Sequence, residues 1–293
     1  GNFVAAADLM EQAMEQSPAW APGWMMTGEF HLKADMLGAA IAAWQRAAEL
    51  DPQGILGAQM HLAAHGIGEV DLDKQAAYVE ALFDHYADRF EEELLQKLDY
   101  SVPEKLAALI ADVMEQRSIK GFAQGLDLGC GTGLMGERLH HIVSHIFGVD
   151  ISAAMVAETR AKSIYDGVEQ GELLAFLEEG NREGDIVTAA DVFIYCPSLL
   201  PIFAAVAKVL REGGLFAFSV ERHDGPEDQM LQASLRYAHS RAAIARELAA
   251  LGFDIVHLKD DVLRHDRGAP INGLLVGAQK PKASIAAIPE VMD

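Results

Sequence analysis

The sequence predicts an α/β fold: a seven-stranded, mostly parallel sheet with a terminal antiparallel hairpin, preceded by an all-helical segment. An apolar run that breaks into glycines, Leu126–Gly133, is typical of a strand that turns into a helix, and Phe147–Asp150 is a second strand that ends in an acid. Before residue 70, apolar and small residues instead recur every three or four positions, which indicates helices. Alternating strands and helices predict parallel strand pairs, and the helical period predicts a separate all-α part.

The glycines can be read in two frames, and each predicts an adenosine-containing cofactor. Gly129–Gly133 has the pattern G-x-G-x-G, whereas Gly131–Gly136 has the dinucleotide pattern G-x-G-x-x-G with Asp150 about 20 residues further on. Glycines let backbone N–H groups approach a ligand, and an acid after the next strand can accept hydrogen bonds from both ribose hydroxyls. Asp127 favours the first frame, because a carboxylate there repels a pyrophosphate but can face an ammonium group.

The remaining elements follow in order along the chain. Pro103 lies in the first turn of a helix before the first strand, and Ser152 is an N-cap residue type before another helix. The later elements are predicted as strand 186–190, helix 199–210, strand 215–220, helix 241–251, a strand from 252 and a last strand at 273–278. The last two strands are joined by a loop, which predicts an antiparallel hairpin. A dinucleotide-dependent dehydrogenase usually needs a further catalytic domain, for which no residues remain.

With Asp127 in front of Gly129–Gly133, the chain resembles the class I methyltransferases that use S-adenosylmethionine (SAM). The resemblance implies a Rossmann-like sheet, SAM as cofactor and S-adenosylhomocysteine as product. It also implies that Met155 packs on the adenine face and that Glu172 accepts from the adenine amino group. The cofactor-binding residues that the resemblance implies are Tyr86, Asp127, Gly129, Cys130, Gly131, Gly133, Asp150, Ile151, Met155, Glu172, Leu173, Ala190 and Asp191.

The N-terminal segment repeats with a period of about 34 residues, which is the length of a tetratricopeptide (TPR) repeat. One full unit is formed by Trp24, Gly28, Ala40, Trp44, Ala47 and Pro52, and half units precede and follow it. Because stable arrays usually contain three or more repeats, we expect the chain to begin inside a longer array. A helical hairpin without a partner surface is the alternative.

Phe83, Tyr86 and Phe90 share one face of a predicted helix between the two parts. This stretch resembles the segment that covers SAM in bacterial TPR-fused methyltransferases related to ubiquinone-type and biotin-pathway enzymes. The resemblance implies that Tyr86 closes over the cofactor, and a helix that merely packs on the sheet is the alternative. The predicted domains are a partial TPR array at 1–70, a helical linker or lid at 71–120, the methyltransferase domain at 121–281 and a C-terminal tail at 282–293.

Tyr195 and His239 are the candidate catalytic residues on the acceptor side. Tyr195 follows the fourth strand, and His239 lies in a Tyr-Ala-His-Ser run similar to one in TPR-fused relatives. The imidazole is able to take a proton from the acceptor, or alternatively to cap a turn. Arg264 is expected to pair with the acids around it. His141 and His145 lie four residues apart on a predicted helix without a third ligand, so no metal site is predicted.

Charge and composition limit the partners. The net charge of −21 divides into −6 up to Val70, from eight acids and two bases, and −15 in the remainder. Neither part has a cluster of Lys and Arg, which argues against nucleic acid, and no run of about 18 apolar residues predicts a membrane helix. The two cysteines, Cys130 and Cys196, lack metal-ligand spacing and are typical of a reduced, cytoplasmic protein.

The sequence thus predicts a SAM-dependent methyltransferase with an unidentified small-molecule or protein acceptor, whose TPR helices bind a protein partner. Two alternatives from other classes stay open at this point. One is a SAM-binding scaffold without turnover, and the other is an NAD-dependent oxidoreductase that uses the second glycine frame.

Overall fold

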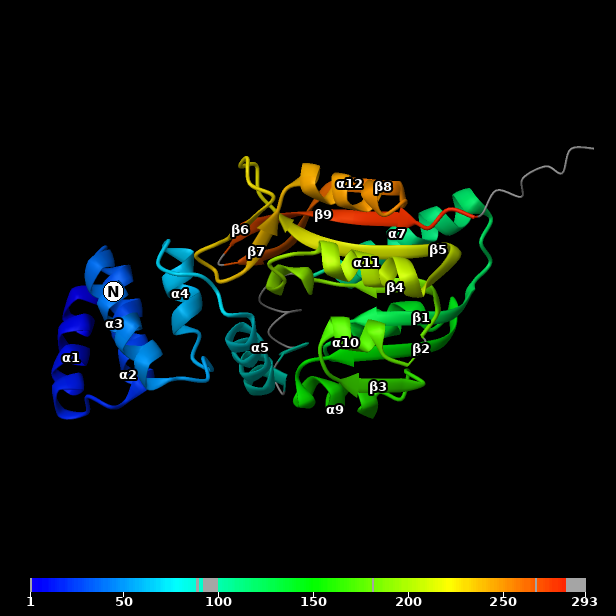
Figure 1. Cartoon of the computed structure of the whole chain (residues 1–293). Coiled ribbons are helices and arrows are strands. Elements are labelled where there is room, and N and C mark those ends of the chain that lie inside the picture. The colour runs from blue at the N-terminus through cyan, green and yellow to red at the C-terminus, as the bar shows by residue number, and fades with distance from the viewer. Residues whose placement is uncertain (1, 88–89, 92–99, 181, 267, 283–293) are drawn as a thin grey trace, which may run out of the picture.

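The computed structural model describes residues 2–87, 90–91, 100–180, 182–266 and 268–282. Four helices at the N-terminus lead through a fifth to an α/β part (Figure 1). The predicted C-terminal tail, 282–293, lies outside the described residues except for Lys282.

One sheet forms the centre of the α/β part. Its strands are β1 (Phe122–Leu128), β2 (Val143–Asp150), β3 (Gly167–Gln170), β4 (Gly184–Ala189), β5 (Leu210–Arg222), β6 (Gln229–Leu231), β7 (Tyr237–His239), β8 (Asp254–Asp266) and β9 (Ala269–Gln279). The first five are parallel in the order β3-β2-β1-β4-β5, and β9 then pairs antiparallel with both β5 and β8. The mostly parallel sheet and its antiparallel hairpin are therefore confirmed.

Among the described residues the sheet has nine strands, not the seven predicted. The additional pair is β6 and β7, a short hairpin between β5 and α12 (Arg241–Ala250). Strand β7 continues the sheet beside the end of β5, where Glu221 lies opposite Ala238. Strands of three residues are too short to show an alternating pattern, so this hairpin could not be predicted from hydrophobic periodicity.

Helices cover both faces of the sheet. They are α7 (Val102–Arg117), α8 (Leu134–Leu139), α9 (Ala153–Ala161), α10 (Leu173–Glu178) and α11 (Leu200–Val209), together with α12. Leu126 and Phe216 belong to a core that includes residues of α10, α11 and α12, whereas Ile186 and Leu215 belong to a core with α7 and α8. Because side chains alternate along each strand, two apolar cores form on opposite sides.

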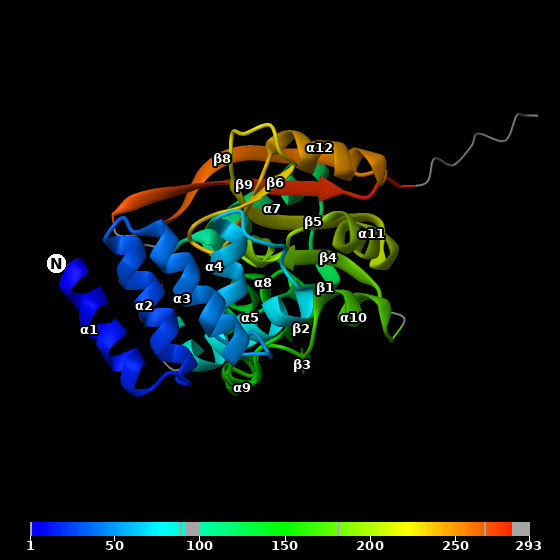
Figure 2. The same ribbon diagram turned by 60° about the vertical axis from the view of Figure 1, so that its left-hand side comes forward.

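The N-terminal segment is all-helical, as predicted. Its helices are α1 (Phe3–Gln16), α2 (Ala21–Lys33), α3 (Leu37–Leu50) and α4 (Ala58–Ala64), with α1 to α3 side by side (Figure 2). Trp44 is fully buried, and a Cβ on Gly28 would lie 2.3 Å from its indole nitrogen. The small residue on α2 therefore makes room for the large one on α3.

Helix α5 (Leu72–Tyr86) connects the two parts and is tied to the sheet by its own side chains. Asp84 accepts hydrogen bonds from the Ser152 hydroxyl at 2.5 Å and from the Ala154 amide at 3.2 Å, at the start of α9. Near the other end of α5, the Gln75 amide donates to the Tyr195 carbonyl at 2.5 Å. The helix is thus held across the carboxyl ends of β2 and β4.

Candidate cofactor and acceptor site

The glycine loop after β1 adopts a backbone that glycine alone takes up easily. Gly129, Gly131 and Gly133 have φ angles of +62°, +54° and +88°. A Cβ on Gly129 would lie 2.5 Å from the Val192 side chain, whereas one on Gly131 would meet, among the described residues, Phe90 alone, at 3.9 Å. The first glycine is therefore needed for packing, and the second leaves open space for a ligand.

Asp150 ends β2 and is bonded to the glycine loop. Its carboxylate accepts from the Gly131 and Ser152 amides, both at 2.9 Å. The residue is only 8% exposed, and burial raises the pKa of the carboxyl while the two amides act in the opposite direction. This bond fixes the loop against the end of the neighbouring strand.

A cavity of about 720 Å³ lies at the carboxyl ends of β1, β2 and β4, beneath α5. Several of the predicted residues line it: Tyr86, Gly129, Cys130, Gly131, Asp150, Ile151, Glu172, Leu173, Ala190, Asp191 and Tyr195. The α5 side of the wall is largely apolar and aromatic, and Phe83 meets Tyr195 edge to face with ring centroids 5.4 Å apart. The fold therefore brings together predicted residues from four separate loops and one helix.

Asp127 lies beneath the glycine loop, and it is not among the residues that line the cavity. Its carboxylate is 1% exposed and accepts from the Tyr165 hydroxyl at 2.6 Å and the Thr188 hydroxyl at 2.7 Å. Burial raises the pKa of Asp127 to about 6, although both hydroxyls oppose the rise. The Tyr165 hydroxyl also accepts from the Gly136 amide at 3.0 Å, so the network supports the first turn of α8.

Three other predicted residues also lie away from the cavity wall. Gly133 is the N-cap of α8, and Met155 is fully buried, with its amide donating to Ser152. His239 is 3% exposed, and its Nε2 lies 3.2 Å from the Phe193 carbonyl oxygen. Burial lowers the pKa of His239 to about 4, which keeps the ring neutral at pH 7.

The predicted histidine pair is not on one helix. Helix α8 ends at Leu139, and His145 lies in β2, where its ring contacts Asp166 at 2.9 Å. No group of three or more His, Cys, Asp or Glu side chains among the described residues is arranged to hold a metal ion. Likewise, none of the described helices is both long and apolar enough to cross a membrane.

Buried ion pairs close the other end of the cavity. Arg264 donates to both carboxylate oxygens of Asp191, at 2.8 and 2.6 Å, and also pairs with Glu221. The expected pairing of Arg264 with acids is confirmed, but the acids come from the loop after β4 and from β5. Asp191 has a φ of +59°, a strained conformation for a residue with a side chain, and the bidentate contact holds it there.

Arg236 lines the same end of the cavity, and the sequence did not indicate it. It lies in the turn between β6 and β7, and its hydrogen-bond partner is the Tyr195 hydroxyl. Tyr195 therefore joins the loop after β4 to this hairpin. Since the hairpin itself had no recognisable pattern, neither its position nor its arginine could be assigned.

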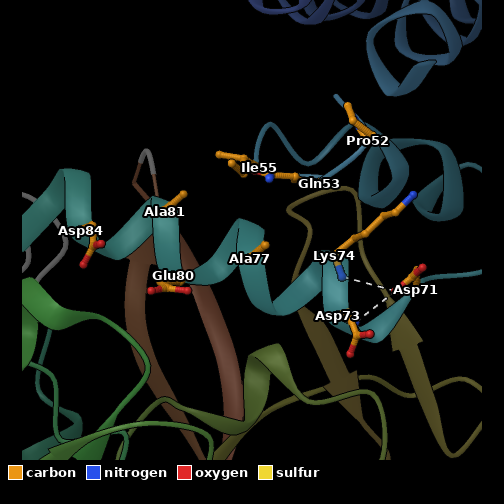
Figure 3. Close-up of a pocket in the computed structure, with 10 residues that line it drawn as sticks. All are labelled: Pro52, Gln53, Ile55, Asp71, Asp73, Lys74, Ala77, Glu80, Ala81 and Asp84. Carbon is orange, nitrogen blue, oxygen red and sulfur yellow. Dashed lines mark hydrogen bonds between the residues drawn. The ribbon is translucent and has the colours of Figure 1, made fainter. Parts of the chain in front are cut away.

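A second hollow of about 580 Å³ lies between the loop after α3 and the outer side of α5 (Figure 3). It contains several acids, but two of them have structural partners. Asp71 caps α5 by accepting from the Asp73 and Lys74 amides, and Asp84 accepts from Ser152 on the side toward α9. We assign no ligand to this open groove.

Comparison with known proteins identifies the α/β part. Residues 126–218 match the profile of a family described as "Methyltransferase domain". The chain contains a SAM-dependent methyltransferase domain. The cofactor of this domain class is SAM, and the matched residues run from β1 through the glycine loop to β5.

The curated relatives that match the methyltransferase domain are distant. A "Ubiquinone biosynthesis O-methyltransferase" of Hahella chejuensis is 27% identical over 112 residues, which cover 37% of this chain and 47% of the relative. A "Malonyl-[acyl-carrier protein] O-methyltransferase" of Enterobacter lignolyticus is 28% identical over 137 residues, covering 46% and 54%. The chain thus spans about half the length of the curated relatives it matches.

A solved structure supports the fold. An S-adenosylmethionine-dependent methyltransferase from Clostridium acetobutylicum superposes with a TM-score of 0.51 at 18% identity, covering 68% of this chain and 99% of that one. At this identity the likeness shows a shared Rossmann-like architecture of the methyltransferase domain.

The methyltransferase domain has the features that SAM requires of a site. Gly131 and Gly171 both border the cavity, and a Cβ on Gly171 would meet nothing within 4 Å. The buried carboxylate of Asp150 lies beside them, at the end of β2. An adenosyl group requires backbone that it can approach closely and a carboxylate that accepts hydrogen bonds from its ribose. The residues present therefore fit the cofactor.

Proposed function

We propose that this chain is an active SAM-dependent methyltransferase that transfers a methyl group to an oxygen nucleophile of a small molecule. The observation that carries the proposal is the cavity in which Asp150, the glycine loop and the acceptor-side residue Tyr195 share one wall. The names of the two relatives, both O-methyltransferases, favour oxygen as the acceptor atom.

The residues that would hold the cofactor follow from their places on the cavity wall. Asp150 would accept from the ribose hydroxyls, and Glu172 and Leu173 would flank the adenine. Tyr86 is 39% exposed at the end of α5, where it would cover the adenosyl group from outside. Asp127 would act indirectly, by holding the turn that carries the glycines.

The bound cofactor supplies an activated methyl group and a good leaving group. The work left to the protein is to align the two reactants and to exclude water. Helix α5 does both, because Asp84 and Gln75 fasten it over the carboxyl ends of the strands. Its apolar side chains then form a dry cover over the reacting atoms.

The cavity has few side chains that are able to take a proton from a methyl acceptor. Among the described residues that line it there is no histidine or lysine. Asp191 is held by Arg264 at both oxygens, and the neutral His239 faces the Phe193 carbonyl instead. The site therefore suits an acceptor whose nucleophilic atom is already unprotonated when it binds.

For the N-terminal helices we propose a TPR-like array that binds a protein partner. The repeated spacing of the sequence and the packing of Trp44 against Gly28 on neighbouring helices support this assignment. Ala40 and Ala47 are fully buried at the same helix interface.

Calorimetric titration with S-adenosylhomocysteine, with NAD in parallel, tests the proposed function. We expect micromolar binding of S-adenosylhomocysteine alone, and a loss of about 10- to 100-fold in Asp150→Asn, because two hydrogen bonds to a charged acceptor are lost. Asp185→Asn is the matched control, since Asp185 also accepts two backbone amides at 2.9 Å but at the opposite end of the sheet. Preferential binding of NAD, or an unchanged affinity in Asp150→Asn, would contradict the assignment.

A further inference from the structure

Arg236 is presented to the cavity by a well-fixed turn. The Gln232 amide donates to the Arg236 carbonyl at 2.9 Å, and Leu235 adopts a φ of +62° within the turn. Leu235 and Tyr237, the residues on either side of Arg236, pack with Met60 of α4 in a small apolar cluster. The guanidinium therefore has a defined place at the acceptor end of the site.

The positive charge of Arg236 is not neutralised by an ion pair within the described part of the chain. Its hydrogen-bond partner is the neutral Tyr195 hydroxyl. Glu221 is close enough to act on Arg236 electrostatically, but one of its oxygens pairs with Arg264 and the other accepts from Gln232 at 3.3 Å. Among the described residues, several of the five guanidinium N–H donors of Arg236 therefore have no acceptor and are available to a ligand.

A half-buried cation with donors at the edge of a cavity is a favourable place for an anion to bind. At this end of the cavity Asp191 is already paired with Arg264. Much of the rest of the wall is apolar or aromatic, with Leu72, Tyr78, Ile202 and Leu235 on it. The ligand that matches this wall has an apolar body and one anionic group. A carboxylate fits better than a phosphate, because Arg236 is the one cavity-lining guanidinium without an ion pair among the described residues, and the protein as a whole carries a charge of −21.

We propose that the methyl acceptor is a carboxylic acid with an apolar body, whose carboxylate binds the Arg236 guanidinium beside the Tyr195 hydroxyl. This inference rests on the proposed function, and it adds the chemical class of the acceptor. Such an acid is ionised at neutral pH, so its recognition requires no proton transfer to the protein. In this proposal Tyr195 binds the carboxylate of the acceptor and does not act as a catalytic base.

The test is the binding of simple probes to the full chain saturated with S-adenosylhomocysteine. Octanoate, octanamide and octylamine have the same apolar body and differ in the charge of the head group. We expect octanoate to bind about tenfold or more tightly than the other two, as for a hydrogen-bonded ion pair in a partly buried site. In Arg236→Met that preference should disappear, and in Arg236→Lys part of it should remain. Arg211→Met is the matched control, because Arg211 forms only exposed ion pairs, with Glu183 and Asp185.

The affinity for S-adenosylhomocysteine separates the possible failures. If the unmodified chain does not bind it, the proposed function fails. If it binds and octanoate shows no preference over octanamide, or keeps its preference in Arg236→Met, the carboxylate assignment fails alone. A loss of S-adenosylhomocysteine affinity in Arg236→Met, with Arg236→Lys and the control unaffected, would also overturn it, since Arg236 would then hold the carboxylate of the cofactor.

Discussion

Asp127→Asn should remove a pH dependence that the buried carboxylate imposes on stability. The pKa of Asp127 rises from 3.8 to about 6 on folding, because burial penalises the charged form more than the Tyr165 and Thr188 hydroxyls favour it. Between about pH 4 and pH 6, the folded protein therefore keeps a proton on Asp127 that the unfolded chain has released. The contribution to stability is therefore fully present below about pH 4 and is lost as the pH rises through about 6.

The magnitude follows from the size of the shift. About two pKa units correspond to about 3 kcal/mol in total, of which about 1.3 kcal/mol falls between pH 5 and pH 7. The free energy of unfolding of the unmodified protein should thus fall by about that amount relative to Asp127→Asn over this range. Asp254→Asn, a substitution of an exposed aspartate on β8, should show no comparable change.

Urea titrations at several pH values measure the difference, with far-UV circular dichroism as the signal. Tryptophan fluorescence would report the wrong part of the molecule, because Trp20, Trp24 and Trp44 all lie before α4. A difference between the two proteins that stays constant from pH 5 to pH 7 would refute the reasoning. In that case Asp127 would remain ionised in the folded protein, and its two hydroxyl partners would outweigh its burial.

Three further outcomes follow from the packing and the charges. Arg264→Ala leaves the buried Glu221 and the partly buried Asp191 without their cation and should cost about 3–5 kcal/mol in urea unfolding, against less than about 1 kcal/mol for the exposed Arg211→Ala. Gly28→Ala places a methyl group 2.3 Å from the indole of Trp44, so the free energy of unfolding of the N-terminal helices should fall by about 1–3 kcal/mol. Tryptophan fluorescence during urea unfolding measures this change. An unchanged transition would show that α2 and α3 move apart easily. His239→Asn should leave the pH profile of turnover unchanged once an acceptor is found, because the ring is buried away from the cavity; loss of the low-pH limb of the profile would instead identify His239 as the base.

The sequence predicted the parts of this molecule that depend on local patterns. Glycines at 129–133 require a turn, and Asp150 ends a strand, so the meeting of these residues at one end of the cavity could be predicted from the sequence. Asp127 and Met155 could not be placed in the same way. Their distance from the wall depends on how Tyr165 and the start of α9 pack beneath the loop, which no spacing along the chain reveals.

The acceptor side was harder to predict because its residues come from long-range contacts. Arg264 meets Asp191 across 73 positions in the chain, and Gln75 reaches Tyr195 across 120. His239 was placed correctly after the fifth strand, but the parallel pairing of β7 with β5 buries its ring. A motif identifies what a side chain is able to do, and the tertiary pairing of its strand decides where it is placed.

The contact between α4 and the β6–β7 turn links the two parts energetically. Met60 is buried against the residues on either side of Arg236, so a displacement of α4 would be transmitted to the guanidinium. Binding free energies at two linked sites are reciprocal: a partner that changes the affinity for the acceptor by some factor has its own affinity changed by the same factor. A protein bound to the N-terminal helices would then be an allosteric effector of the enzyme, and the filled acceptor site would report its state back to that partner.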